Sequence, residues 1–545
     1  MRKLFAILAI ASAVYGNELS YKSLQSGPNG ATTPLYDHGI HGEGQIIAFL
    51  DTGVDYDTCF FVEPDGRKPP INTRVDETTV DLTRRKIIAY DFLYSCDQYP
   101  NAATCDDPNS PTGYDSQGHG THAAASAAGD RGTPITHDYG DAIATGAKIV
   151  VQDAGVSGND LCTQRPGIGC PVNLTPIFTQ AYLQGARIHS NSWGDEQGSP
   201  FSPPTANYPQ SAHDVDAFVW SHPDFLVVFN TGNFGNTGMA PPSTLSAPGS
   251  AKNTLDVGGT RDGNHYADDE ISSFTLVGPT RDGRIKPDVV GPAYVMAGDA
   301  KIVSNGQTCG ISFQPGTSWA SPSIAGAVAL VRQYYTDGFY PTGIATPANR
   351  IIPSAALLKA TIIASAERVP YYGPLLQPTQ PVPSYEQGFG FPVLDDALYF
   401  PGDASKLKIE DVPLDSGLTQ GQTSTLPITA RAGTPLKVVL VWTDPPGTVS
   451  GRTDSTPQLV NDLDLRLTDP AGTSIWGNDV LHPGQPDRLN NVEAVSIAQP
   501  LTGTYTITVS APRLGLGPRQ SYALVVTGDI GDGSPHSVRA HAARH

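Results

Sequence analysis

Strand-length apolar runs that alternate with helix-like segments constrain the fold of this 545-residue chain most strongly. Such runs occur at residues 45–50, 148–151, 187–190 and 225–229, and most are rich in Ile, Val, Leu or Phe with little polar alternation. Continuous apolar strands separated by helices are typical of a parallel sheet that is covered on both faces. We therefore predict an α/β domain with a doubly wound, mostly parallel sheet over about residues 44–364.

The sequence changes character after about residue 407. Short β-rich runs follow at 436–442, 462–467, 504–509 and 521–527, separated by Asp-Pro turns and without a helical period. This pattern favours a second domain, an antiparallel β-sandwich or jelly roll.

The N-terminus has the order of a secretory signal. Arg2 and Lys3 precede an apolar run at 4–14 and a small residue, Gly16. This order predicts a signal peptide over residues 1–16 and an exported protein, with a buried N-terminal helix as the alternative. No later apolar stretch is long enough to span a bilayer, so we expect no membrane span in the mature chain.

Export would make the six cysteines an oxidised set, although the sequence does not select one pairing. Local bridges Cys96–Cys105 and Cys162–Cys170 are one expectation, because each pair brackets a short loop that contains Pro. A zinc site is the competing interpretation, but no Cys-x-x-Cys spacing supports it.

The net charge of the chain indicates which kinds of macromolecule it can bind. Acidic residues outnumber basic ones by 53 to 34, for a formal net charge of −19. We expect no nucleic-acid partner, because Lys and Arg must neutralise a phosphate backbone.

Three polar clusters have the residue types of nucleophilic catalysis. DTGVD at 51–55 follows a predicted strand, GHGTH at 118–122 precedes an Ala-rich helix, and GTSWASP at 316–322 opens an apolar helix. An Asp held at the end of a buried strand can orient an imidazole. A Ser at a helix N-terminus can attack a carbonyl while its own N–H stabilises the oxyanion.

Each cluster alone has another interpretation. Taken alone, Asp51 is better interpreted as a turn residue after a strand. Asp-Thr-Gly also occurs in aspartic proteases, although no second copy is present. His119 and His122 could bind a metal, but their i, i+3 spacing without a Glu matches a zincin poorly. Ser318 could be a helix N-cap. The three clusters together follow the order Asp, His, Ser that is known for subtilisin.

The chain resembles the subtilisin-like serine protease family, the subtilases. Besides the three clusters, NTGN at 230–233 and GRIKPDVV at 283–290 match this family, and the resemblance covers about residues 44–364. It implies a subtilisin-like fold and peptide-bond hydrolysis through an acyl-enzyme, with no cofactor required for the chemistry.

The resemblance also implies roles for individual residues. Ser318 becomes the nucleophile, His119 its general base, and Asp51 the residue that fixes the imidazole tautomer. Asn233 and the Ser318 backbone N–H would form the oxyanion hole. A turn residue that tolerates a left-handed conformation is the alternative for Asn233.

Substrate contacts are implied in the same way. The residues that look like the family's substrate-binding strand and pocket floor are Ser192, Trp193, Gly194, Thr231 and Gly232. A polypeptide would add there as a β-strand. Because residues 230–232 contain no acidic side chain, we expect an uncharged residue at P1.

The C-terminal block resembles the jelly-roll domain appended to some secreted subtilases, which often carries calcium. Asp462 and Asp464 alternate along one predicted strand and could converge with Asp479 or Glu493, an oxygen set that suits a structural Ca²⁺. The alternative is a solvated acidic edge that discourages strand pairing.

The chain therefore divides into a signal peptide (1–16), a subtilisin-like catalytic domain (17–400), a jelly-roll domain (401–528) and a flexible tail (529–545). Two features depart from the family pattern. Trp319 follows the nucleophile where Met is common. Only 34 residues, 17–50, lie between the predicted signal peptide and Asp51 where a longer pro-domain is usual, so we expect either folding without one or a truncated sequence.

Two other functions compete with proteolysis. A non-catalytic binding module would have no need of Asp51, His119, Asn233 and Ser318 together. A lipase or esterase would use a Gly-x-Ser-x-Gly elbow and the order Ser, Asp, His. We therefore predict a secreted serine endopeptidase that acts on polypeptide substrates.

Overall fold

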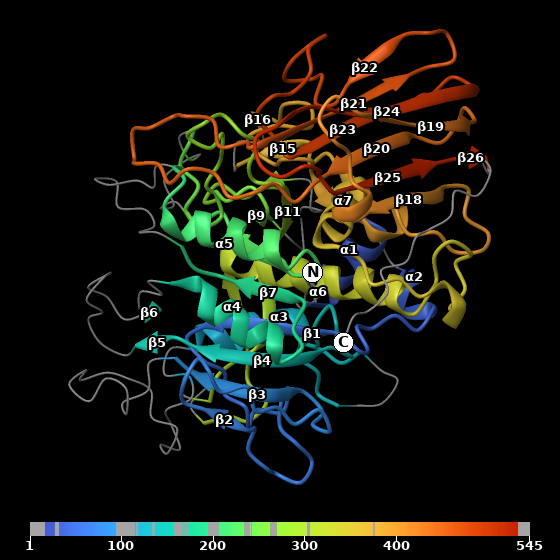
Figure 1. The fold of residues 1–545 in the computed structure, drawn as a ribbon. Coiled ribbons are helices and arrows are strands. Elements are labelled where there is room, and N and C mark those ends of the chain that lie inside the picture. Colours follow the sequence, from blue (N-terminus) through green and yellow to red (C-terminus); the bar gives the residue numbers. More distant parts are fainter. Residues whose placement is uncertain are drawn as a thin grey trace, which may run out of the picture.

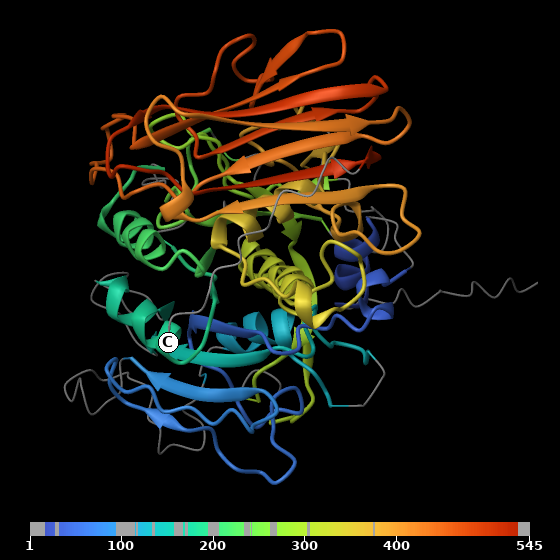
Figure 2. The ribbon, with the colours of Figure 1, turned by 45° about the vertical axis from the view of Figure 1, so that its right-hand side comes forward.

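The computed structural model describes most of the chain, and the described ranges are residues 17–27, 32–93, 115, 118–132, 137–156, 167–168, 173–194, 206–233, 240, 242–261, 270–301, 306–373 and 377–531. A β-sandwich is stacked on an α/β part (Figures 1 and 2). The predicted signal peptide and the predicted local disulfides lie outside the described residues. Of the predicted tail, Ile530–Gly531 form strand β26 at the edge of a sheet.

Eleven strands of the described residues form the central sheet, in the order β16-β15-β10-β9-β8-β7-β1-β4-β3-β2, with β11 also paired to β9. The pairs that connect β4, β1, β7, β8 and β9 are all parallel. Parallel pairing was predicted for β1, β4, β7 and β8 from their continuous apolar sequences. The strands are β1 (Ile46–Asp51), β2 (Ile71–Asn72), β3 (Ile87–Phe92), β4 (Lys148–Asp153), β7 (Ile188–Asn191), β8 (Leu226–Asn230), β9 (Leu255–Thr260), β10 (Glu270–Ile271), β11 (Val289–Pro292), β15 (Tyr371–Tyr372) and β16 (Gln377–Pro378).

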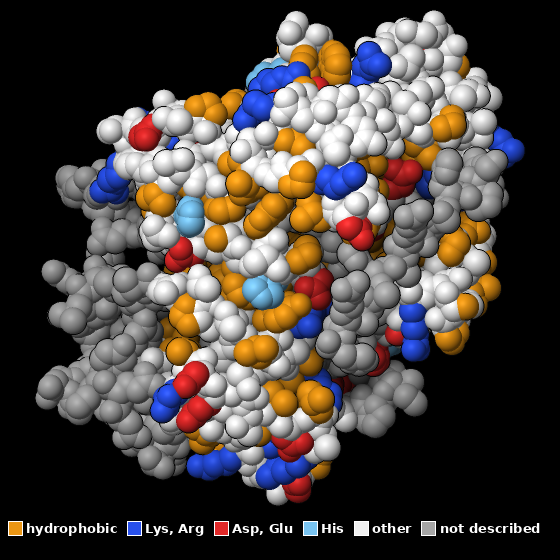
Figure 3. All heavy atoms as spheres, in the orientation of Figure 1, with side chains coloured by type: hydrophobic (Ala, Val, Ile, Leu, Met, Phe, Trp, Pro, Cys, Tyr) orange, Lys and Arg blue, Asp and Glu red, His pale blue; other side chains and the backbone are white. Residues whose placement is uncertain are grey.

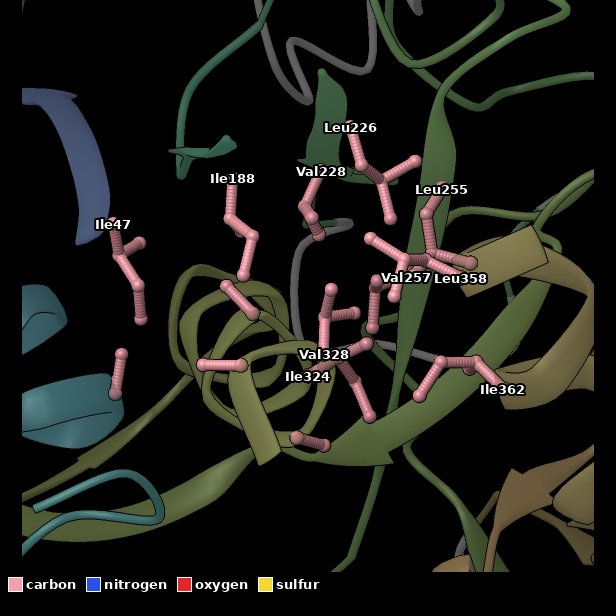
Figure 4. Close-up of a cluster of buried hydrophobic side chains, with 14 of the residues drawn as sticks. Ile47, Ile188, Leu226, Val228, Leu255, Val257, Ile324, Val328, Leu358 and Ile362 are labelled. Atoms are coloured by element: carbon pink, nitrogen blue, oxygen red, sulfur yellow. The ribbon is translucent and has the colours of Figure 1, made fainter. Parts of the chain in front are cut away.

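Helices cover both faces of this sheet. Ile188 of β7 points toward α6, whereas the next residue, His189, contacts Phe178 of α4 with ring centroids 4.7 Å apart (Figure 4). Neighbouring residues of one strand thus contact helices on opposite faces, which is the doubly wound arrangement predicted. The helices are α1 (Asn17–Ser26), α2 (Pro34–Asp37), α3 (His119–Ala128), α4 (Leu174–Leu183), α5 (Gln210–Ser221), α6 (Thr317–Thr336) and α7 (Ala355–Ser365).

Apolar side chains pack α6 against the sheet. Figure 4 shows Ile188 and Val228 directed from β7 and β8 toward Ile324 and Val328 of α6. All four side chains are completely buried. Burial of apolar surface contributes roughly 25 cal/mol per Å². This layer therefore stabilises the packing of α6 against the face of the sheet.

Short two-stranded pairings complete the α/β part. Strands β12 and β13 form an antiparallel hairpin-like pair that leads into α6, and β14 pairs with β17 close to α7. Their bounds are β5 (Gly155–Val156), β6 (Gly167–Ile168), β12 (Tyr294–Gly298), β13 (Ile311–Pro315), β14 (Ala366–Glu367) and β17 (Phe391–Pro392).

The C-terminal part is an antiparallel sandwich of two sheets, ordered β18-β25-β20-β23 and β22-β21-β24-β19-β26. Side chains from both sheets, including Leu440, Leu465 and Ile507, form its separate core. The strands are β18 (Lys406–Val412), β19 (Thr423–Ala430), β20 (Leu436–Val441), β21 (Asn461–Thr468), β22 (Ser474–Trp476), β23 (Val492–Ile497), β24 (Gly503–Leu514) and β25 (Tyr522–Gly528).

Buried polar contacts join the sandwich to the α/β part. Lys252 Nζ lies 2.9 Å from Asp216 Oδ2 and 3.5 Å from Asp444 Oδ2, and all three side chains are completely buried. The side chain of Asn253 also donates to the Asp444 carbonyl, at 2.8 Å. Lys252 and Asp216 both belong to the α/β part, so separating the two parts would remove the Asp444 carboxylate from Lys252 and break the hydrogen bond from Asn253. These buried contacts therefore hold the two parts together.

Three further observations concern the disulfide pairing, membrane spans and surface charge. A disulfide joins Cys59 to Cys309, 250 residues apart, a pairing that the sequence left open. No helix of the described ranges has the length and hydrophobicity to cross a membrane. On the face drawn in Figure 3, the coloured Lys and Arg side chains lie in separate small groups rather than one continuous basic area.

Candidate active site

The first two predicted site residues are in direct contact. β1 ends at Asp51 and α3 begins at His119. Asp51 Oδ1 lies 2.7 Å from His119 Nδ1 and also accepts the backbone N–H of Thr52, at 2.8 Å. The Asp51 carboxylate is buried, whereas 31% of the His119 side chain is exposed. A buried carboxylate thus holds one ring nitrogen while part of the ring remains accessible from outside.

The electrostatics of His119 follow from this contact. Burial lowers the pKa of His119, but the charge and the hydrogen bond of Asp51 act in the opposite direction, and Asp115 adds to them. The net pKa is raised above 6.5. The protonated imidazole is therefore stabilised beside Asp51, as a general base requires after it accepts a proton.

Ser318 is the second residue of α6, and the residue that follows it contacts the His119 ring. The next side chain, Trp319, has its ring centroid 4.8 Å from that of His119. Pro322 has no N–H to donate to the carbonyl of Ser318, four residues earlier in the helix. The hydroxyl of Ser192 donates to that carbonyl instead, at 2.7 Å, and so ties the end of β7 to the predicted nucleophile.

Asn233 is oriented by the start of the same helix. The backbone N–H and the hydroxyl of Thr317 both donate to Asn233 Oδ1, at 2.8 and 3.0 Å. Asn230 Nδ2 in turn donates to the Thr317 hydroxyl, at 3.1 Å. With its oxygen engaged, Asn233 directs Nδ2 away from Thr317, toward the space beside Gly316. A side-chain amide donor therefore lies next to the turn that precedes Ser318.

A family model described as "Subtilase family" matches residues 42–390, which is more than half of the chain. The chain belongs to the subtilase family. This match includes all four residues Asp51, His119, Asn233 and Ser318, and it extends into the strands that follow α7.

The sequence identities between this chain and individual members of the family are low. The subtilase is 27% identical to "Serine protease/ABC transporter B family protein tagA" of Dictyostelium discoideum over 94% of this chain, but it spans about a third of that relative's length, 32%. It is 27% identical to "Thermophilic serine proteinase" of Bacillus sp. (strain AK1), over 58% of this chain and 59% of the relative. It is 26% identical to "Pyrolysin" of Pyrococcus furiosus over 53% of this chain and 22% of the relative.

The predicted substrate residues lie at the carboxyl ends of β7 and β8, the same sheet edge as Asp51. Trp193 is half-buried and packs edge-on against Phe229, with ring centroids 5.2 Å apart. Thr231 is completely buried, and its carbonyl accepts the backbone N–H of Ser246, at 2.9 Å. Gly194 and Gly232 follow in the same two turns. This common edge is the usual ligand-binding edge of an open α/β sheet.

One supporting residue was missed by the sequence analysis. The Asp115 carboxylate accepts the N–H of Gly118 at 2.8 Å, the hydroxyl of Thr52 at 3.0 Å, and both the N–H and the hydroxyl of Thr121 at 2.8 and 2.6 Å. Burial raises the pKa of Asp115 to about 7, against these hydrogen bonds. Asp115 thereby caps α3 in place of Gly118, which has no side chain. An Asp three residues before the cap position, Gly118, was the available signal.

Close backbone packing also sets the Asp51–His119 geometry. A Cβ atom on Gly120 would lie 2.1 Å from the Gly53 carbonyl oxygen and 3.1 Å from Asp51 Cβ. Only glycine lets α3 approach the turn after β1 this closely.

Gly120→Ala is therefore expected to lower both stability and activity. Relief of the clash must separate α3 from the Asp51 turn, which we expect to cost about 3 kcal/mol of stability and about 10²-fold in kcat/KM. Thermal unfolding and peptide-cleavage kinetics would measure the two effects. Gly451→Ala is the matched control, because no atom lies within 4 Å of its added methyl group. Equal kinetics for the two variants would contradict this account.

The predicted calcium ligands have a different environment from either expectation. Asp462 and Asp464 are buried rather than solvated, and Arg488 contacts both carboxylates. A register irregularity in β21 lies between the two residues. Glu493 Oε2 instead accepts the N–H of Leu465, at 2.7 Å.

Arg488 already supplies the positive charge between Asp462 and Asp464, so in this arrangement these residues do not fit a Ca²⁺ ion. Within the described ranges no cluster of three or more His, Cys, Asp or Glu side chains could hold a metal.

Proposed function

We propose that this chain is a serine endopeptidase that hydrolyses peptide bonds through Ser318, His119 and Asp51. One observation carries the proposal: the 2.7 Å contact between Asp51 and His119 lies beside the helix start that bears Ser318. A non-catalytic binding module would gain nothing from a buried carboxylate directed at a half-exposed imidazole next to a helix N-terminal Ser.

The chemistry follows from the placement of each group. Ser318 Oγ forms a bond to the scissile carbonyl carbon while its proton passes to His119 Nε2, and the carbonyl electron pair moves onto the oxygen. The Ser318 N–H and Asn233 Nδ2 donate to that oxyanion. Collapse of this intermediate breaks the C–N bond, and His119 returns the proton to the leaving amine. Water then hydrolyses the acyl-enzyme by the same steps.

The substrate is proposed to be an extended polypeptide. It would pair with the backbone after β7 and β8, where main-chain hydrogen bonds supply affinity and side-chain pockets supply specificity. The absence of an acidic residue at 230–232 favours an uncharged P1 residue. Export of the protein is supported by the N-terminal sequence pattern and by the disulfide Cys59–Cys309.

A fluorophosphonate probe tests this function, because it phosphonylates only an activated serine. The unmodified chain should be labelled at one residue, Ser318, and should cleave an unfolded protein substrate. Ser318→Ala should lose both properties. Ser323→Ala is the matched control on the same helix, because among the described residues the Ser323 hydroxyl donates to the Trp319 carbonyl alone, at 2.9 Å. Equal labelling of Ser318→Ala and the unmodified chain, or no labelling of either, would contradict the proposed function.

A further inference from the structure

The indole of Trp319 has a donor without an acceptor. Its side chain is only 6% exposed, yet Nε1 is buried and has no hydrogen-bond partner among the described residues. Native proteins pair nearly all such groups, so a buried donor without a partner at a candidate active site calls for an explanation. An indole N–H donates and cannot accept, so the missing partner must be an acceptor.

This N–H lies close to the side-chain amide of Asn233. A Cβ atom on Gly316 would lie 3.4 Å from Trp319 Nε1 and 3.8 Å from Asn233 Nδ2. The two nitrogen atoms therefore border the same small space beside Gly316, and Gly316 lies two residues before Ser318 in the sequence. Glycine at position 316 keeps that space free of a side chain. One of these donors, Asn233, is already assigned to the oxyanion in the proposed function.

We propose that Trp319 Nε1–H is a third oxyanion-hole donor, beside the Ser318 N–H and the Asn233 amide. This inference rests on the proposed function. The indole N–H donates to the scissile carbonyl oxygen, and the hydrogen bond strengthens when the attack of Ser318 places the electron pair on that oxygen. Trp319 transfers no proton and forms no bond, so it acts only by stabilising charge that develops in the transition state.

Packing of the Trp319 ring offers a different role that the test must separate. The ring centroid lies 4.8 Å from that of His119 and 4.4 Å from that of His122. A ring that merely supports His119 would act through its shape and would alter the titration of the base when removed. An oxyanion donor acts through one N–H group and leaves that titration unchanged.

Trp319→Phe retains an aromatic ring and removes the N–H. We expect kcat to fall by about 10- to 100-fold with KM changed less than about twofold, because two donors remain. The affinity for a peptidyl trifluoromethyl ketone, which forms a tetrahedral oxyanion on Ser318, should fall by the same factor. The pH midpoint of kcat/KM should not move. Asn233→Ala provides the reference loss, and Trp476→Phe in β22 provides the control for an indole remote from the site.

Several outcomes would overturn this inference. They are an unchanged kcat, a loss of kcat without a parallel loss of ketone affinity, or a loss accompanied by a shifted pH midpoint. If Trp319→Phe does not fold, replacement of Trp319 by 3-benzothienylalanine keeps the double ring, lacks the N–H, and should give the same loss. Absence of labelling and cleavage by the unmodified chain would refute the proposed function as well, whereas an active chain with a fully active Trp319→Phe would refute this inference alone.

Discussion

Replacing Ser318 by Ala should lower kcat by about 10⁶-fold while leaving KM nearly unchanged. The expected size follows from the loss of the covalent path: without the hydroxyl, water must attack the carbonyl directly, and His119 has no nucleophile to activate. In the proposed function, substrate binding uses the backbone after β7 and β8, which this substitution does not alter. Steady-state cleavage of a peptide substrate and direct binding measurements on the variant would provide the two quantities.

The same prediction extends to a double variant. His119→Ala should cost nearly as much as Ser318→Ala, and the combination should cost little more than either, because the two side chains act as one unit. Multiplicative losses in the double variant would mean that Ser318 and His119 contribute independently. That result would be incompatible with proton transfer between them, even if each single variant were impaired.

Asp51→Asn should lower kcat by about 10⁴-fold at neutral pH, although the substitution barely changes the shape of the side chain. The carboxylate at 2.7 Å accepts a hydrogen bond from His119 Nδ1 and leaves Nε2 to act as base. An amide can instead donate to Nδ1, which selects the wrong tautomer, and it carries no charge to stabilise the imidazolium. The kinetics of the variant near pH 7 would measure this loss.

The pH dependence supplies a second readout for the same substitution. His119 acts as base only when neutral, so activity should fall as pH decreases through its pKa, which is raised above 6.5. Burial lowers this pKa and Asp51 raises it, so removal of the Asp51 charge leaves burial dominant. The midpoint of kcat/KM should therefore move to lower pH in Asp51→Asn. Asp337→Asn, at the end of α6, should match the unmodified chain, and a midpoint that rises in Asp51→Asn would exclude this electrostatic role.

Features encoded by neighbouring residues were predictable. The apolar runs that became β1, β4, β7 and β8 identified a parallel sheet, because a strand buried on both faces needs no polar alternation. The motifs around Asp51, His119 and Ser318 likewise identified three turns, each with its own local sequence.

Features that depend on partners distant in the chain were not predictable in this way. Arg488 was not anticipated between Asp462 and Asp464, nor Asp115 between the Asp51 turn and α3. The disulfide Cys59–Cys309 was one pairing among many. Residue types and spacing specify what a side chain can do, whereas its actual partner is selected when packing of the sheet and helices brings separated segments within a few ångströms. Trp319 illustrates the difference. The sequence alone places it directly after Ser318, but the space that its N–H faces forms only when folding brings Asn233 and Gly316 beside it.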